Sequence, residues 1–214
     1  LLPPRLLKLT SIRFGMAIAL LFFSAWSGFM FCMALTMQAG LGMAPWQSGN
    51  SFIALGVAYF ISALYAPKLI ARYSMGRILL TGLSVQIVGL LLCATFYRLA
   101  THTSTLALIP STALIGYGQA LIVNSFYRIG MRDISASDAG AGSAILSTLQ
   151  QATLGLGPAI LGSLFLTLAQ RSGGDYPRAL IDFLAVEVVM MLVLGAIALW
   201  LRRHLNVRPA VATP

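Results

Sequence analysis

Residues 139–169 read AGAGSAILSTLQQATLGLGPAILGSLFLTLA, a stretch without a single charged residue. Small or polar residues recur in it at steps of three and four, which places them on one face of a helix. They are Gly140, Ala144, Thr148, Gln151, Gly155, Ala159 and Gly162. The larger apolar residues mostly take the other faces: Leu146, Leu149, Leu156, Leu161 and Phe165. Because helices in a bilayer associate by close backbone packing, the pattern predicts a transmembrane helix whose small residues line a seam and whose large residues face lipid.

Two interpretations of this helix stay open. In the first, the small residues form a packing stripe and nothing more. In the second, the helix lines a cavity or moves during function, with a bend at Pro158 beside Gly157 and with Gln150 and Gln151 as polar contacts.

The composition of the whole chain identifies an integral membrane protein. Of the 214 residues, 58% are hydrophobic and 9% are charged, and the mean hydropathy is +0.87. Soluble domains carry about 25% charged residues. The net charge of +9 does not indicate a nucleic-acid partner, because the basic residues stand singly or in small groups between long apolar runs, whereas a DNA reader needs a concentrated basic face.

Six apolar stretches approach or exceed the roughly 20 residues that a helix needs to cross a bilayer. The predicted spans are residues 14–37, 46–70, 77–97, 105–127, 139–169 and 179–201. Residues 1–13 form a predicted lead-in and residues 202–214 a predicted tail. Asp138 stands where it can cap the fifth span. The fold class that follows is an all-α, six-span membrane bundle, and the non-Met first residue is typical of a piece of something larger.

The distribution of Lys and Arg predicts the orientation of the spans. Eleven of the fourteen Lys and Arg residues lie in the lead-in, the second and fourth loops and the tail. The remaining three, Arg98, Arg171 and Arg178, lie in the alternate loops. By the positive-inside rule, both termini are expected in the cytoplasm, with the protein in the cell (inner) membrane.

Catalytic and metal-binding chemistry find no support in the sequence. Cys32 and Cys93 lie inside apolar runs and are expected to be buried small hydrophobic residues. His102 and His204 are far apart and near span ends, so no metal site is expected. The chain also has no Ser/His, paired-carboxylate or metal-ligand set at membrane-surface positions. No cofactor is expected, and the chain is not expected to be an enzyme.

Three motifs, in this order, resemble the major facilitator superfamily, and most closely the C-terminal six spans of its fourteen-span drug:proton antiporters. The first span connection holds Gln38, Gly40, Gly42, Pro45 and Gly49. The second loop holds Leu69, Arg72, Gly76 and Arg77, with Lys68 before them. The fifth span holds Gly142, Ser143, Gln151, Gly155, Gly157 and Gly162. The acidic residue usual in the basic loop is absent near Ala71, where this chain departs from the family.

The resemblance implies a half-bundle built from two inverted three-helix repeats. Such a half rocks against a missing N-terminal half around a site at the bilayer midplane. It also implies that the first, second, fourth and fifth spans line the substrate cavity. The polar residues in the fourth and fifth spans fit that position and are the substrate-cavity candidates: Tyr117, Gln119, Asn124, Gln150 and Gln151.

Only two carboxylates lie within a predicted span, Asp182 and Glu187, both in the sixth. Asp182 is near the span end, whereas Glu187 lies about 12 Å deep at 1.5 Å per residue. Because a charge at that depth costs several kcal/mol, such residues are commonly functional. Glu187 is therefore the proton-coupling candidate. A neutral Glu187 that makes one interhelical hydrogen bond satisfies the same physical requirement. The sequence favours this structural role, because the resemblance implies that the third and sixth spans are peripheral to the cavity.

Two functions from different classes remain. The first is half of a secondary transporter that exports lipophilic or cationic small molecules in exchange for protons. The alternative is a non-transporting six-span membrane anchor, sensor or assembly subunit. An anchor has no need for Gln119, Asn124, Gln150 and Gln151 inside apolar helices, so the sequence favours the transporter.

Overall fold

The computed structural model describes residues 4–99 and 105–205, with side chains described as far as Leu201. Within this part of the chain the structure is all-helical and contains six helices that are long and apolar enough to cross a membrane, which confirms the predicted fold class. His102 and Arg208 lie outside the described residues, as do the side chains of Arg202, Arg203 and His204.

The six spans are built from eight α-helices. Their bounds are α1 Thr10–Ile18, α2 Ser24–Leu35, α3 Pro45–Asn50, α4 Ile53–Tyr73, α5 Met75–Leu99, α6 Ile109–Gly130, α7 Ala139–Arg171 and α8 Tyr176–Leu205. The first span joins α1 and α2 through a π-helical segment, Ala19–Phe23, and runs from Thr10 to Gly40. The second span joins α3 and α4 and runs from Pro45 to Tyr73. Pro45 starts α3, where its missing N–H breaks no helical hydrogen bond.

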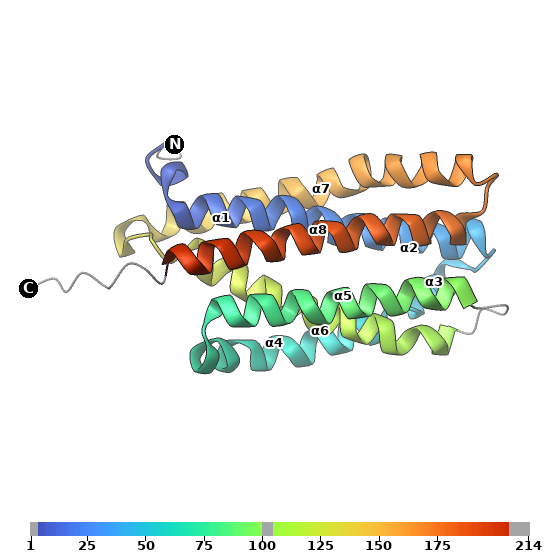
Figure 1. Ribbon diagram of the computed structural model, residues 1–214, viewed down its shortest axis with the longest axis horizontal. Helices are drawn as coiled ribbons and strands as arrows, with labels where there is room; N and C mark the ends of the chain where they lie inside the picture. The colour runs from blue at the N-terminus through green and yellow to red at the C-terminus, as the bar shows by residue number, and fades with distance from the viewer. Residues whose placement is uncertain (1–3, 100–104, 206–214) are drawn as a thin grey trace, which may run out of the picture.

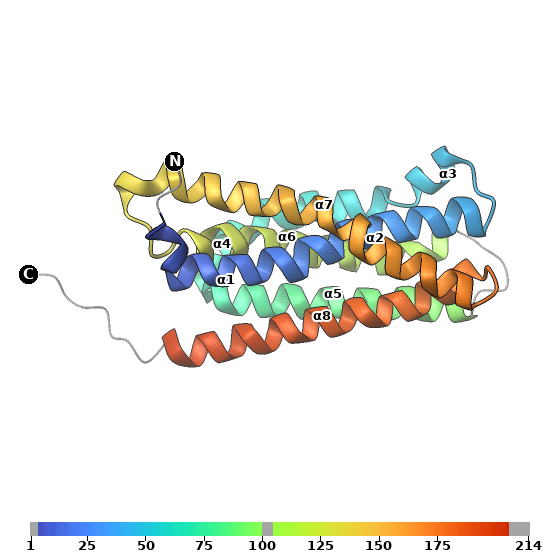
Figure 2. The ribbon, with the colours of Figure 1, turned by 90° about the horizontal axis from the view of Figure 1, so that it is seen from above.

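The helices lie roughly along one common axis and form two groups (Figure 1). Helix α6 packs against α4 and α5, and α7 packs against α2 and α8. Contacts between α5 and α8 and between α1 and α6 join the two groups. The two described ends of the chain lie at the same end of the bundle (Figures 1 and 2), as six spans require.

The first three spans and the last three spans make equivalent contacts. Spans one, two and three correspond to spans four, five and six, respectively. The second span packs on the fourth, and correspondingly the fifth packs on the first. The first–fourth and third–sixth pairs, which map onto themselves, are also in contact. Because successive spans cross the bilayer in opposite directions, this pattern is that of two three-helix units in inverted orientation.

The expected orientation of α7 does not hold within the described part of the chain. Of its seven small or polar stripe residues only Gly162 is buried, and the other six are exposed. Three of the five large residues expected to face lipid, Leu146, Leu161 and Phe165, lie in the core. Leu149 is partly buried, and Leu156 is exposed as expected. In an uncharged helix almost every face is apolar, so the sequence pattern alone does not say which face meets the neighbouring helices.

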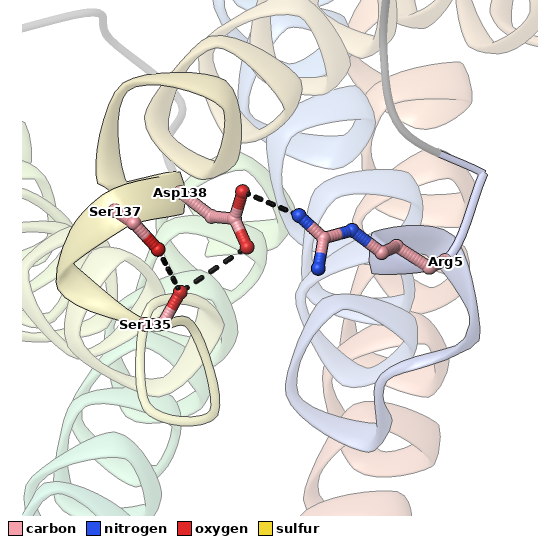
Figure 3. A network of polar contacts seen from close by, with 4 residues as sticks. All are labelled: Arg5, Ser135, Ser137 and Asp138. Atoms are coloured by element: carbon pink, nitrogen blue, oxygen red, sulfur yellow. Dashed lines mark hydrogen bonds and ion pairs between the residues drawn. The ribbon is translucent and has the colours of Figure 1, made fainter.

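The first turn of α7 also differs from expectation. Asp138 precedes α7 but its carboxylate makes no capping hydrogen bond to the helix. It forms an ion pair with Arg5 at 2.8 Å and accepts a hydrogen bond from the Ser135 hydroxyl at 3.1 Å (Figure 3). The side chain therefore ties the lead-in to the α6–α7 loop. Cys32 and Cys93 are buried free thiols, as predicted.

Candidate substrate-facing surface

Two aromatic rings from the first and second spans stack on each other. The Trp26 ring of α2 lies 5.9 Å from the Tyr59 ring of α4, with an interplanar angle of 27°. Both side chains are only partly buried. Trp26 packs against Phe22 and Phe23, which are fully buried and whose ring centroids lie 5.9 and 6.1 Å from the Trp26 ring. The stack is therefore a supported aromatic face and not a loose side-chain contact.

A hydrogen bond joins the fourth and fifth spans. The Tyr127 hydroxyl of α6 donates to the Gln150 Oε1 of α7. The Tyr127 ring is itself packed edge-on against Phe126 at 4.9 Å, and Tyr127 lies within electrostatic range of Tyr59. We call Trp26, Tyr59, Tyr127 and Gln150 the aromatic–amide surface. Its four residues come from four different spans, and all four are partly exposed.

The other predicted cavity residues lie in different environments. Gln119 is fully buried, and neither its Oε1 nor its Nε2 has a hydrogen-bond partner among the described residues. Asn124 turns back to its own helix, where its Nδ2 donates to the Ala120 carbonyl at 2.9 Å. Tyr117 packs in a small cluster with Leu121, and its carbonyl accepts a bond from Ser62. Gln151 is exposed.

Sequence reasoning missed Trp26 and Tyr59. Both lie in apolar runs where aromatic residues are common, and neither breaks the hydropathy pattern. The signal that does point to them is structural: they belong to the first and second spans and stack on each other only after folding. A π-helical segment directly before α2 changes the helical register of the first span ahead of Trp26, and such segments are frequent at functional sites.

The glycines expected to pack or gate in α7 divide into two groups. A Cβ added at Gly157 would collide with the Ser27 hydroxyl and the Ser24 carbonyl, and one added at Gly162 would lie 2.9 Å from the Phe31 ring. At Gly140 and Gly155 no described atom lies within 4 Å of such a Cβ. Helix α7 continues through Pro158. The close backbone contact of α7 is therefore with α2, at Gly157.

The predicted basic loop forms the tight turn between α4 and α5. Ser74 adopts a positive φ of 85° and separates the two helices. Arg72 stacks over the Tyr73 ring at 5.3 Å, while Lys68 and Arg77 are exposed. Residues Gly76 and Arg77 belong to the first turn of α5. The loop thus places basic side chains at one end of the bundle. Arg5 and Arg132 lie at the same end, which we call the basic end.

The two carboxylates of α8 have opposite surroundings. Asp182 is exposed, whereas Glu187 is 1% exposed, and its Oε1 has no hydrogen-bond partner among the described residues. Glu187 lies within electrostatic range of Cys32 in α2 and Cys93 in α5. It therefore points into the bundle and not toward lipid. The interhelical hydrogen bond that would make it purely structural is not seen at Oε1.

Groups of three or more His, Cys, Asp or Glu side chains that could hold a metal ion do not occur among the described residues. The aromatic–amide surface offers hydroxyl, amide and ring-face contacts instead. Aromatic faces attract organic cations and also bind neutral apolar molecules. Chemically, the surface suits binding of a lipophilic compound without covalent change.

Comparison with known proteins agrees with this chemistry. The chain is 29% identical over 164 residues to the probable actinorhodin transporter of Streptomyces coelicolor, a match that covers 76% of this chain and 28% of that protein. It is 28% identical over 156 residues to the multidrug efflux pump LfrA of Mycolicibacterium smegmatis, covering 72% of this chain and 30% of the pump. No family model matches the chain.

The chain is similar to drug-efflux transporters. The six apolar helices identify a multi-pass membrane protein, and the two relatives are named as a transporter and an efflux pump. The chain spans less than a third of the length of the two curated relatives it matches.

Proposed function

We propose that this chain is the C-terminal six-span half of a fourteen-span secondary transporter of the major facilitator type. In this proposal it works with an N-terminal half and exports lipophilic or cationic compounds by alternating access. The observation that carries the proposal is the aromatic–amide surface. Trp26, Tyr59, Tyr127 and Gln150 come from the first, second, fourth and fifth spans, the same four spans that the family resemblance assigns to the cavity.

The exposed face of α7 supports a partner half. Its small residues Gly140, Ala144, Gly155 and Ala159 are exposed, with open space beside Gly140 and Gly155. Helices in bilayers use such small-residue faces for close approach to another helix. Helix α4 also leaves large residues exposed, among them Phe60 and Leu64. We infer that the missing half packs on these faces, while the aromatic–amide surface faces the substrate between the halves.

Proton coupling is assigned to Glu187 in this proposal. A carboxylate that is 1% exposed and has no ion pair with any described residue is costly when charged. Gain or loss of a proton there is consequently tied to a change in its surroundings, such as the movement of α8 against α2 and α5. The basic end would lie on the cytoplasmic side of the inner membrane, because most of the described Lys and Arg residues gather there.

Transport by the full-length protein tests the proposal. The protein is reconstituted in vesicles with an imposed pH gradient and presented with a panel of cationic and neutral lipophilic compounds. We expect accumulation of cationic aromatic compounds that stops when the gradient is collapsed by a protonophore. If the reconstituted protein moves no compound of the panel under any gradient, the anchor or sensor reading replaces the transporter.

A further inference from the structure

A pocket at the basic end of the bundle lies outside the aromatic–amide surface. Its volume is about 460 Å³, and its walls come from the start of α1, the α4–α5 turn, the end of α6 and the end of α8. It therefore lies where the two three-helix units meet. Among its lining residues are two arginines, Arg77 and Arg132, together with Asp133.

The acidic side chain of this pocket has a hydrogen-bond partner, whereas its two basic side chains have no ion-pair partner among the described residues. Asp133 Oδ2 accepts a hydrogen bond from the Ser11 N–H at 3.2 Å, so this carboxylate is engaged at the first turn of α1. Neither Arg77 nor Arg132 has a carboxylate within ion-pair distance in the part of the chain that the structure describes. The two guanidinium groups leave the pocket positive, and they are free to bind an anion.

Backbone and hydroxyl donors add to the two arginines. Helix α5 begins at Met75 in the pocket wall, and the first N–H groups of a helix carry partial positive charge. A Cβ added at Gly76 would meet only open space, so a ligand can approach the backbone there. Ser11 also lines the pocket. It is 4% exposed, and its Oγ has no hydrogen-bond partner among the described residues.

The remaining wall of the pocket is apolar. Phe14, Leu79, Ile129 and Leu201 line it on the side of the bundle core. An arginine pair with helix N–H groups is the donor set that phosphate prefers, because guanidinium binds phosphate oxygens in bidentate fashion. Basic pockets between membrane helices at the interface can hold lipid headgroups in this manner.

We propose that this pocket binds a phosphate group through Arg77, Arg132 and the Ser11 hydroxyl, with the group carried either by an anionic phospholipid or by a soluble phosphate. The apolar wall would accommodate the glycerol and upper acyl chain of a lipid. Occupation of the pocket would join α1, α5, α6 and α8 at one end. The site is separate from the substrate surface, so binding there is measurable without transport.

The test measures thermal unfolding of the full-length protein in nonionic detergent. Phosphatidylglycerol, phosphatidylcholine and inorganic phosphate are titrated separately, with sodium chloride at matched ionic strength as the salt control. We expect phosphatidylglycerol to raise the unfolding midpoint more than phosphatidylcholine. Arg77→Gln and Arg132→Gln should each weaken the apparent affinity by about tenfold, as expected for the loss of a charged hydrogen bond.

Variants elsewhere make the result specific. Arg98→Gln and Arg171→Gln, at the opposite end of the bundle, should keep the wild-type affinity. Ser11→Ala removes a buried hydroxyl that has no described partner, so it should leave the ligand-free midpoint unchanged and weaken binding. Gly76→Leu fills open space, so it should also fold and weaken binding. If an arginine variant does not fold, the binding measured for Ser11→Ala and Gly76→Leu decides whether the site exists.

The arms of the titration identify the source of the phosphate. A response to phosphatidylglycerol alone assigns a lipid headgroup, and a response to inorganic phosphate that competes with the lipid assigns a soluble phosphate. Both outcomes support the site. The site would be overturned if the wild type and the Arg77→Gln/Arg132→Gln protein responded equally to phosphatidylglycerol and to phosphate. It would also be overturned if phosphatidylglycerol and phosphatidylcholine shifted the unfolding midpoint equally and phosphate did not shift it.

Discussion

Gly157 of α7 lies directly against Ser27 of α2, so close that a Cβ on Gly157 would collide with the Ser27 hydroxyl. Ser27 is held there because its hydroxyl donates to the Phe23 carbonyl of its own helix at 3.0 Å. The hydroxyl of Ser24, one turn earlier on α2, donates across to the Thr153 carbonyl of α7 at 3.2 Å. This contact sets the distance between the first and fifth spans and thereby the position of Gln150 next to Tyr127.

Gly157→Ala should destabilise the protein by about 1–3 kcal/mol, because the added methyl group forces the backbones of α2 and α7 apart. Gly155→Ala, two residues earlier on the same helix, should be neutral or slightly stabilising, since its Cβ meets open space and Ala favours helix. Chemical or thermal unfolding of the full-length protein in detergent measures both. Equal losses for the two variants would contradict the contact with Ser27.

A second pair of variants, Gly155→Leu and Leu156→Ala, tests whether the missing half packs on the exposed small-residue face of α7. If the missing half packs there, Gly155→Leu should lower transport several-fold without changing the stability of the contacts described here. Leu156→Ala removes an exposed large side chain beside it and should leave transport near the wild-type level. Initial transport rates in vesicles, normalised to the amount of inserted protein, give the answer. Full activity of Gly155→Leu would show that this face meets only lipid.

Tyr127→Phe removes the hydroxyl that donates to Gln150 but keeps the ring. We expect a several-fold loss of transport of compounds that use polar contacts, since one hydrogen bond to a neutral group contributes about 0.5–1.5 kcal/mol. Tyr65→Phe, on the exposed face of α4, is the matched control. Apparent affinity is compared across the compound panel. If Tyr127→Phe and Tyr65→Phe behave alike for every compound, the aromatic–amide surface does not contact substrate.

Trp26→Ala removes one ring of the stack with Tyr59. Because aromatic faces bind cations, transport of cationic compounds should fall more than that of neutral ones, whereas Trp26→Phe should retain part of both. The ratio of cationic to neutral transport is the measurement. An unchanged ratio in Trp26→Ala would argue that the stack has a packing role only.

Glu187→Gln keeps the size and hydrogen-bonding capacity of the side chain but cannot exchange a proton. We expect the variant to insert and fold, to lose concentration of substrate driven by a pH gradient, and to retain downhill exchange. Asp182→Asn, five residues earlier on α8 and exposed, should behave like the wild type. Transport by Glu187→Gln that still follows the pH gradient would move the coupling residue elsewhere in the full-length protein.

Two polar contacts at the basic end, Arg5 with Asp138 and Asp133 with the Ser11 N–H, should contribute differently to the free energy of unfolding. Arg5→Gln breaks an ion pair whose arginine is 71% exposed, so the loss should be under about 1 kcal/mol. Asp133→Ala removes the acceptor for the Ser11 N–H at the first turn of α1, and a lost cap costs about 1 kcal/mol or more. Unfolding in detergent ranks the two variants, with Lys8→Gln as the control. A larger loss for Arg5→Gln would reverse this assignment.

The sequence by itself determined the fold class and the six spans. Long uncharged runs such as residues 139–169 have no stable alternative to helix in a bilayer, where every backbone N–H and C=O must bond within its own segment. The hydropathy of such a segment depends only on its own residues, so the sequence alone is enough to recognise the span. The polar residue Gln150 was also visible as an exception to that run, although its hydrogen bond to Tyr127 was not.

Only the tertiary structure decided which faces of the helices meet. The small-residue face of α7 was expected to be its packing seam, yet Leu146 and Phe165 occupy the core and Gly155 faces open space. When all faces of a helix are apolar, hydrophobicity no longer distinguishes inside from outside, and shape decides. The same holds for Trp26 and Tyr59, which lie 33 residues apart in sequence and stack only because α2 and α4 are brought together by folding.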